Sequence, residues 1–319
     1  MLSKSVRAAL ALLLLPATAM AQGTGQGWAP ERPVTIVNPY AAGSTTDTLA
    51  RTLAQGMTAR LAQPVVVQNR DGAAGGIGTA FVTRAAPDGH TLLFAPAVVL
   101  SVLPARGDPG YGPEALVPIC QTFENAMAIA VRPESPFATL ADLVAAARAR
   151  PGAVTFGHQG IASIPHLAAL ELAEAAGLQF QDVPYRGEPA VLTDLRAGRV
   201  DFAVTVMGSL AGQNMRVLGV FAPARHPLMP EVPTVAELGF PVAPTSFGGL
   251  FAPAGTPQAA RVALEAACLA AARDEAYRAV AARVFQPETP EAPADALAAR
   301  LARDIADKRR LLTAIGAAR

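Results

Sequence analysis

Apolar positions along this chain follow two periodicities, one typical of strands and one of helices. A short apolar run at 34–37, held between two prolines, predicts a buried strand. Leu49, Leu53 and Met57 then recur at steps of four residues, which is the spacing of one helix face. The same alternation continues to residue 95, and this strand–helix order predicts a parallel sheet covered by helices.

The later elements follow from the same two patterns. Apolar runs predict strands at 65–68, 91–95, 126–131, 154–157, 183–187, 200–206, 217–221 and 248–252. Helical spacing predicts helices at 79–86, 140–150, 165–175, 190–197 and 234–238, and over most of 257–316. Residues 104–118 carry repeated Pro and Gly, which predicts an extended surface loop.

Two strand–loop–helix units share similar signals at the helix start. In the first, Ser44 followed by Asp47 predicts a helix cap whose hydroxyl accepts from a backbone N–H. In the second, Ser163 and Pro165 mark a helix start after a loop at 158–164. The positive end of a helix can bind an anion without a basic side chain. An ordinary capped turn has the same residues, so each unit alone leaves both interpretations open.

A glycine-rich loop, Asp-Gly-Ala-Ala-Gly-Gly-Ile-Gly at 71–78, precedes the second helix. Its glycines do not follow the dinucleotide order G-x-G-x-x-G, and no Lys-Ser/Thr pair follows as in a P-loop. The loop therefore predicts a tight turn or a close approach of its backbone to a neighbouring element.

The first residues carry the pattern of an export signal. Two basic residues precede the apolar stretch 8–15, and Ala19-Met20-Ala21 offers small residues at a cleavage site. The apolar stretch is too short to span a bilayer. We expect residues 1–21 to be removed, so that the mature protein starts near Gln22 in the periplasm.

Charge and cysteine content restrict the partners. The chain has 26 Lys and Arg against 25 Asp and Glu, a formal net charge of +1. Loss of Lys4 and Arg7 with the leader leaves −1, which indicates neither nucleic acid nor an anionic membrane surface. No later apolar run reaches membrane length, so we expect a soluble mature protein. A disulfide between Cys120 and Cys268 is one alternative, and their apolar surroundings favour two buried thiols.

The sequence offers no catalytic constellation. The four histidines, at 90, 158, 166 and 226, show no metal-binding spacing with another His, Cys or Glu. No G-x-S-x-G elbow is present, and the carboxylates are scattered singly. His166 follows Ser163 by three residues, where ligand contact and a structural role are both open. We therefore predict a binding protein without metal or cofactor, in preference to an enzyme.

Short stretches from Arg32 to the C-terminus match one family in order. They read Arg-Pro-Val at 32–34, Gly-Ser-Thr-Thr-Asp-Thr at 43–48, Gln-Pro-Val-Val-Val at 63–67, Asn-Arg at 69–70, Ala-Pro-Asp-Gly-His-Thr-Leu-Leu at 86–93, Val-Pro-Tyr-Arg-Gly at 183–187, Val-Pro-Thr-Val-Ala-Glu at 232–237 and Leu-Phe-Ala-Pro-Ala-Gly-Thr-Pro at 250–257. Together they resemble the Bug family, the TctC-type periplasmic receptors of tripartite tricarboxylate transporters.

The resemblance implies a type II-like periplasmic binding protein with two α/β domains, each a mostly parallel sheet flanked by helices, and a ligand in the cleft between them. Residues 22–130 and 251–319 would form the first domain, and residues 131–250 the second. A loop at each helix start would hold a ligand carboxylate, largely through backbone N–H groups and bridging waters. The ligand-binding residues implied are Tyr40, Ala41, Ala42, Gly43, Ser44, Thr45, Thr46 and Asp47 in the first loop, Gln159, Gly160, Ala162, Ser163, Ile164 and His166 in the second, and Thr205.

Three departures from the family pattern shape the expected ligand. The first loop has Ala41, Ala42 and Ser44 where the family is richer in Gly and Pro, which narrows its backbone conformations. Thr205 stands where many members carry an Asp able to hold an ammonium group, so it argues against an amino-acid ligand. The segment 208–215 is shorter than in the family, which reshapes that wall of the cleft.

We expect a small organic carboxylate whose distal part is less charged, next to Ile161, Ile164 and Val206, with Arg186 as the nearest candidate cation. The partner would be a membrane permease, or a sensor protein if the receptor serves signalling, and the protein itself would be a monomer. An exported enzyme is a third alternative, which would require turnover that depends on the two loops.

Overall fold

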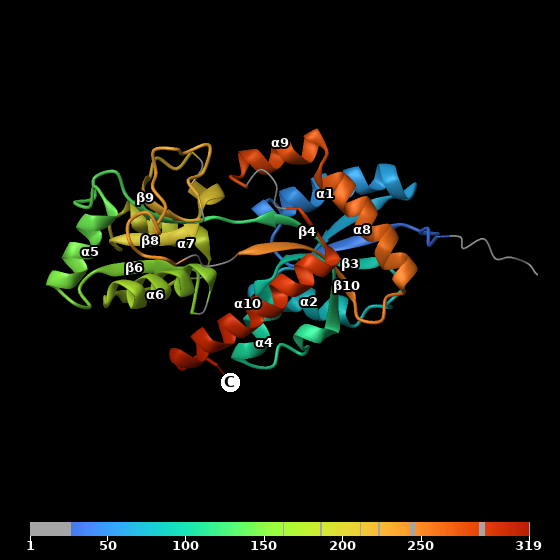
Figure 1. The fold of residues 1–319 in the computed structure, drawn as a ribbon, viewed down its shortest axis with the longest axis horizontal. Helices are drawn as coiled ribbons and strands as arrows, with labels where there is room; N and C mark the ends of the chain where they lie inside the picture. Colours follow the sequence, from blue (N-terminus) through green and yellow to red (C-terminus); the bar gives the residue numbers. More distant parts are fainter. Residues whose placement is uncertain are drawn as a thin grey trace, which may run out of the picture.

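The computed structural model describes residues 27–161, 163–185, 187–210, 212–222, 224–242, 246–286 and 291–318. The predicted leader, Ala162 and Arg186 lie outside these ranges. The described chain forms two sheets, each flanked by helices, which lie beside one another along the long axis of the molecule (Figure 1). The predicted α/β fold with two sheet-and-helix units is confirmed.

The first sheet combines the N-terminal strands with strands from later in the chain. Its strands are β1 Val34–Asn38, β2 Val65–Asn69, β3 Thr91–Pro96, β4 Leu116–Glu124, β10 Phe247–Pro253 and β11 Ala292–Pro293. Their order is β11-β4-β10-β3-β1-β2. β1 runs parallel to β2 and β3, whereas β10 runs antiparallel to β3 and β4, and β11 antiparallel to β4.

The second sheet is built from the middle of the chain. Its strands are β5 Met127–Val131, β6 Thr155–His158, β7 Gln181–Pro184, β8 Phe202–Val206 and β9 Arg216–Phe221, in the order β7-β6-β8-β5-β9. β6 runs parallel to β7 and β8, and β5 runs antiparallel to β8 and β9. Both sheets are thus mixed, which differs from the mostly parallel sheets expected, because the strands that flank the crossings run antiparallel to their neighbours.

Helices cover both faces of each sheet. They are α1 Thr45–Leu61, α2 Gly76–Thr83, α3 Val98–Ser101, α4 Leu103–Arg106, α5 Leu140–Ala149, α6 Ile164–Ala176, α7 Glu188–Arg196, α8 Gln258–Ala272, α9 Glu275–Arg283 and α10 Ala294–Ala314, with short 3-10 turns η1 Ala73–Gly75, η2 Pro113–Ala115 and η3 Met207–Leu210. The helix predicted at 234–238 is not formed: Thr234 makes a β-bridge with Val220, and residues 235–238 form a turn. Within the described ranges, none of the helices is both long enough and apolar enough to cross a membrane.

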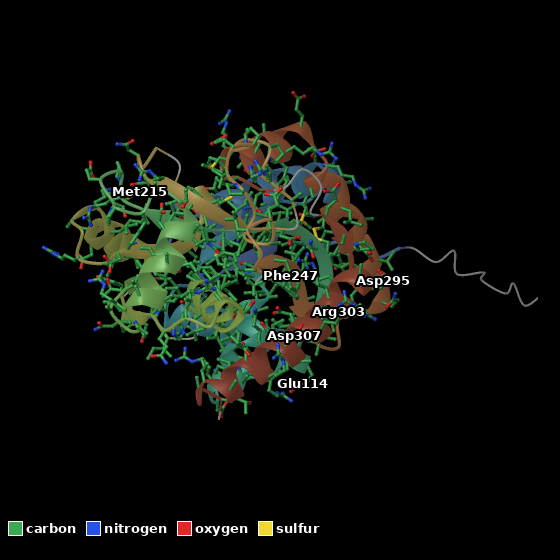
Figure 2. All side chains as sticks on the ribbon, turned by 60° about the vertical axis from the view of Figure 1, so that its left-hand side comes forward. Glu114, Met215, Phe247, Asp295, Arg303 and Asp307 are labelled. Carbon is green, nitrogen blue, oxygen red and sulfur yellow. A yellow bond between two sulfur atoms is a disulfide. The ribbon has the colours of Figure 1, made fainter. Side chains whose placement is uncertain are left out.

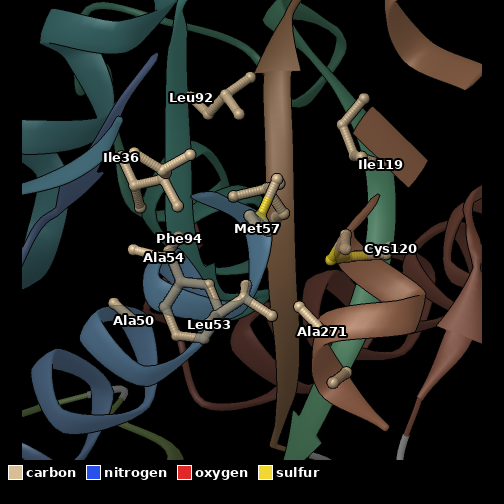
Figure 3. Packing of buried hydrophobic residues seen from close by; sticks show 14 of the residues in the cluster. Ile36, Ala50, Leu53, Ala54, Met57, Leu92, Phe94, Ile119, Cys120 and Ala271 are labelled. Atoms are coloured by element: carbon tan, nitrogen blue, oxygen red, sulfur yellow. A yellow bond between two sulfur atoms is a disulfide. The ribbon is translucent and has the colours of Figure 1, made fainter. Parts of the chain in front are cut away.

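The apolar spacing seen in the sequence corresponds to buried helix faces. Leu53 and Met57 of α1 pack with α8 on one face of the first sheet, where Leu92 and Phe94 lie (Figure 3). On the other face, α2, α3 and α10 cover β3 and β10. In the second unit, α5 and α6 cover one face of the sheet and α7 the other. Each fully buried Leu or Phe stabilises the fold by about 1.5–3 kcal/mol.

β4 was not predicted, because Pro118 and the surrounding Pro and Gly suggested a loop. Pro118 pairs with Phe251 at a register shift in the β4–β10 ladder. A proline has no N–H to donate, so within a sheet it is tolerated at such an irregularity.

Phe247, which begins β10, lies near the centre of the molecule (Figure 2), with the Arg300 guanidinium 4.1 Å from its ring centroid.

The two cysteines are joined. Cys120 of β4 and Cys268 of α8 form a disulfide with their Cα atoms 6.4 Å apart, and both are fully buried (Figure 3). The prediction of two buried thiols is therefore wrong. Apolar surroundings indicate burial, but they do not reveal that β4 and α8, 148 residues apart, pack within bonding distance.

The chain crosses between the sheets twice, from β4 to β5 and from β9 to β10. The division into two domains predicted at residues 130–131 and 250–251 stays a proposal. The strands change sheet between Glu124 and Met127 and between Phe221 and Phe247. Contacts also join the units elsewhere: Leu167 of α6 packs against Leu311 and Leu312 of α10.

Candidate functional site

The first predicted loop connects β1 to α1 and exposes its backbone. Ala41, Ala42 and Gly43 are exposed, and Ser44 caps the helix by accepting a hydrogen bond from the Asp47 N–H at 3.2 Å. The predicted cap is confirmed, and such a cap is worth about 1 kcal/mol. Gly43 has a φ of +80° with open space around it, so glycine serves the backbone conformation there rather than close packing.

The start of α1 presents backbone N–H groups at its positive end. The Ser44 carbonyl accepts from the Thr48 N–H at 3.0 Å, which is the first helical hydrogen bond. The N–H groups of Thr45 and Thr46 come earlier in the first turn, where no preceding helical carbonyl can accept from them. With the helix dipole behind them, these two groups suit an anion.

Asp47 belongs to the structure of the loop. Its carboxylate accepts from the Gly43 N–H at 2.9 Å, from Arg51 Nε at 3.1 Å and from Asn69 Nδ2 at 2.8 Å. The side chain is only 5% exposed. Burial raises the pKa of Asp47, but the hydrogen bonds from Arg51, Gly43 and Asn69 outweigh burial and hold the pKa below its usual range. The carboxylate therefore stays ionised and fixes the loop against β2.

The glycine-rich loop supports the first loop from behind. A Cβ at Gly75 would lie 3.3 Å from the Tyr40 ring, and one at Gly78 would lie 2.8 Å from the Cβ of Pro39. This confirms the predicted close approach of backbone. Tyr40 is half-buried, and burial followed by the nearby Tyr111 raises the pKa of its phenol. Its side chain thus packs inward, while its carbonyl accepts from Asn69 Nδ2 at 3.1 Å.

The second predicted loop connects β6 to α6. Ser163 caps α6 by accepting from the His166 N–H at 3.4 Å, and its carbonyl accepts from Leu167 at 2.9 Å. Pro165 lies in the first turn, as predicted. Because proline has no N–H, Ile164 supplies the free donor of that turn. The Ile164 side chain packs in the core of the second unit, so only its backbone can serve the cleft.

Two histidines stack behind this loop. The rings of His158 and His166 lie 4.3 Å apart between centroids at 26°, and His158 Nε2 is 3.3 Å from a carboxylate oxygen of Asp182. Burial, followed by His158, lowers the pKa of His166 to about 4. The donor atoms of these three residues lie within 4.8 Å of one another. A metal would require ring rotation, because lone pairs in nearly parallel ring planes do not converge on one ion.

Sequence reasoning missed Glu188, which begins α7. Its carboxylate accepts hydrogen bonds from the hydroxyls of Thr205 and Ser209 and from the Val206 N–H, the last at 3.4 Å. The Gln159 side chain also bonds to it, which links it to the second loop. An acidic residue at a helix start was the available signal, but that position usually denotes only a favourable dipole interaction.

Strand directions turn both loops toward the junction of the sheets. β1 and β3 are parallel, and Pro96 at the end of β3 lies opposite Gly248, one residue into β10. In the second sheet, Val206 at the end of β8 lies opposite Met127, the first residue of β5, and β6 is parallel to β8. The carboxyl ends of β1, β6 and β8 therefore lie on the sides of the two sheets where the chain passes from one sheet to the other. Open α/β sheets bind ligands beyond the carboxyl ends of their strands.

A cavity of about 1080 Å³ lies beside this junction. It is bounded by α2, α4, the C-terminal residues and Ile161 of the second loop, and it contains Arg70, Arg84 and Arg106. The Arg70 guanidinium lies 3.6 Å from the centroid of the Phe81 ring. Ile161 is 51% exposed, and its expected place next to the ligand stays a prediction. The cavity is a second place in which an anion with an apolar part would fit.

Two sheet-and-helix units, linked by two crossings and with helix starts at the junction, define the class of two-domain binding proteins. Comparison with known proteins leads to the same class. A family model, the tripartite tricarboxylate transporter family receptor, matches residues 49–316. BugT from Bordetella pertussis is 36% identical over 238 residues, which cover 71% of this chain and 72% of BugT. The chain belongs to the tripartite tricarboxylate transporter receptor family, which is a family of receptors.

Two solved structures extend this comparison to the fold. The periplasmic binding protein BugD superposes with a TM-score of 0.78 at 30% identity, over 91% of this chain and 99% of BugD. MatC from Rhodopseudomonas palustris, solved with bound malate, superposes with a TM-score of 0.76 at 27% identity, over 89% of this chain and 99% of MatC. The fold of a two-domain binding protein is therefore shared along nearly the whole chain.

Proposed function

We propose that the protein is a periplasmic receptor that captures a small organic carboxylate between the first loop, 40–47, and the second loop, 159–166. The observation that carries this proposal is the placement of two helix N-termini at the carboxyl edges of two sheets that meet at one junction. Partial positive charge from two helices favours an anion between them. The malate bound to MatC supports a carboxylate as that anion.

In this proposal the backbone holds the ligand, and side chains set its position. The N–H groups of Thr45, Thr46 and Ile164 donate to the carboxylate, directly or through water. Ser44 and Ser163 hold the two helix starts in place through their caps. Of the remaining residues implied by the family, five belong to the same two loops: Ala41, Ala42, Gly43, Gln159 and Gly160. Tyr40 is half-buried and Asp47, His166 and Thr205 are buried, so their role in this proposal is to support the loops rather than to touch the ligand. Ala162 lies outside the described ranges.

We further propose export by the leader at residues 1–21, a monomeric mature protein, and delivery of the ligand unchanged to a membrane permease of the tripartite tricarboxylate type. Family membership and the likeness to the periplasmic protein BugD support this location and partner. Uptake of labelled ligand by cells with and without the gene of this receptor distinguishes transport from signalling, since loss of a signalling receptor would leave the permease able to take up the ligand.

A thermal-shift screen of the mature chain tests the carboxylate itself. The panel contains monocarboxylates, dicarboxylates, tricarboxylates and amino acids, with the corresponding amides as neutral controls. A ligand at a hundred times its dissociation constant adds about 2.7 kcal/mol to the free energy of unfolding, which raises the melting temperature by a few degrees. The sample is unfolded and refolded first, to remove any retained ligand. Shifts by amides alone, or by no member of the panel, would contradict the proposal.

A further inference from the structure

Glu188 is the strongest unexplained feature of the junction. It is the first residue of α7, and its carboxylate reaches across to the end of β8 and to η3. Thr205, one of its partners, is 1% exposed. The four groups that donate to Glu188 come from the second loop, from β8 and from η3, so this one carboxylate ties together the elements of the second unit that face the junction.

The position of these partners places Glu188 beside the first unit. Val206 lies opposite Met127, which directly follows the crossing from the first sheet. Two residues further on, Gly208 packs so closely against the first unit that a Cβ there would lie 2.6 Å from the Val284 carbonyl oxygen. Gln159 belongs to the second loop itself. The carboxylate is therefore part of the same junction as the proposed carboxylate site.

The charge of Glu188 is not balanced by its described partners. Thr205, Ser209, Gln159 and the Val206 N–H are all neutral donors. Burial raises the pKa of Glu188, and these hydrogen bonds oppose that shift. Glu188 is half-buried, and a carboxylate that is partly shielded from water and has only neutral donors gains from an added cation. The hydrogen bond from the Val206 N–H to Glu188 is long, at 3.4 Å, and therefore weak. A cationic donor could make a stronger hydrogen bond to the same carboxylate.

The same contacts disfavour an anion here. The hydroxyls of Thr205 and Ser209 and the Gln159 side chain are the groups that would otherwise donate to a ligand carboxylate on this side. Glu188 already occupies them, and its own charge would repel a second anion. The second unit therefore offers an anion site at the start of α6 and a cation site next to it at Glu188.

We propose that Glu188 determines the ligand class by binding an ammonium group and excluding a second carboxylate, so that the preferred ligand is an amino carboxylate. This inference rests on the proposed function, since it assumes that the two loops hold the ligand carboxylate. It replaces the expectation drawn from Thr205 alone. At the end of β8, Thr205 stands where many family members carry an acidic side chain. In this chain the carboxylate of Glu188, from α7, lies against the Thr205 hydroxyl instead.

Isothermal titration calorimetry on the refolded mature protein tests this. Each ω-amino or α-amino carboxylate of two to six carbons is compared with the dicarboxylate of equal length. Wild type is expected to bind an amino carboxylate at least about tenfold more tightly than its dicarboxylate counterpart. Glu188→Gln, which keeps the size of the side chain, removes its charge and exchanges one acceptor oxygen for an NH2 donor, is expected to remove this preference. Glu174→Gln, at an exposed position of α6 in the same unit, is the matched charge control and is expected to keep it.

The outcomes separate the two proposals. Binding of carboxylates with dicarboxylates preferred, or a preference that Glu188→Gln leaves unchanged, would overturn the role of Glu188 and leave the carboxylate receptor intact. Absence of binding by every carboxylate would overturn both. Melting temperatures of the variants are measured alongside. If Glu188→Gln unfolds, Glu188→Asp replaces it, and the shorter side chain is expected to weaken binding of amino carboxylates while dicarboxylates stay excluded.

Discussion

Asp47 and Gly43 are joined by a hydrogen bond that closes the first loop on itself: the carboxylate of Asp47 accepts from the Gly43 N–H at 2.9 Å. The same carboxylate binds Arg51 and Asn69, so the exposed turn of the loop is anchored to α1 and β2. A backbone anion site needs donors that are fixed before the ligand arrives, because ordering them on binding would weaken affinity.

Replacing Asp47 tests this anchoring. Asp47→Asn keeps the size of the side chain but removes the charge that Arg51 and the Gly43 N–H bind. We expect the free energy of unfolding to fall by about 2 kcal/mol, as for other hydrogen bonds to charged groups. Ligand binding should weaken roughly tenfold, because the loop is less ordered before binding. Urea denaturation and calorimetry measure the two effects. Asp307→Asn, at an exposed position in α10 (Figure 2), is the control. Unchanged ligand affinity in Asp47→Asn would contradict the anchoring role.

The disulfide between Cys120 and Cys268 should contribute to stability. A link between residues 148 apart restricts the unfolded chain, and its loss typically costs about 2–5 kcal/mol. We expect thiol titration of the unfolded, oxidised protein to detect no free thiol. Reduction should lower the free energy of unfolding to about the value measured for the Cys120→Ala/Cys268→Ala double variant. Two titratable thiols in the oxidised protein would show that the bond does not form.

His166 should make stability depend on pH. Burial, then His158, lowers its pKa from 6.5 to about 4, with Asp182 opposing and Arg106 adding to the shift. The unfolded chain therefore binds a proton near pH 6.5, while the folded chain resists it until about pH 4. The free energy of unfolding should fall across that window as the pH decreases, by on the order of 3 kcal/mol from this residue. Urea denaturation at several pH values measures it. His166→Asn should have a shallower dependence, and an identical dependence in variant and wild type would refute the assignment.

Lys308 of α10 and Glu171 of α6 form an ion pair between the two units at 3.5 Å, with side chains 4% and 22% exposed. Burial raises the pKa of Glu171, and Lys308 opposes that shift. Lys308→Met leaves the Glu171 carboxylate uncompensated, so we expect a loss of about 2 kcal/mol or more in the free energy of unfolding. Lys308→Met combined with Glu171→Gln should recover much of it. A double-mutant cycle with no coupling energy would show that the pair contributes nothing.

Much of the fold and of the two loops could be predicted because their signals are formed by residues close together in the sequence. Ser44 with Asp47, and Ser163 with Pro165, are signals that span a few residues, and the structure places a helix cap at each. Apolar spacing in α1 identified a buried face for the same reason. These patterns require no knowledge of which segments meet in space.

What the sequence did not reveal depends on contacts between distant segments. Pro118 suggested a loop because the irregularity that accommodates it exists only once β4 pairs with β10. The disulfide partners meet through the packing of α8 on the first sheet. Glu188 reaches Thr205 from a different element, and only the folded arrangement of α7 and β8 brings the two together.

The proposed receptor function requires that a ligand carboxylate is held between the helix starts of α1 and α6. The most direct test is a crystal structure with the ligand that gives the largest thermal shift. We predict a carboxylate oxygen within hydrogen-bond distance, directly or through one water, of N–H groups from both 40–47 and 159–166. A ligand held instead in the cavity with Arg70, Arg84 and Arg106, with the two loops free of it, would contradict the claim.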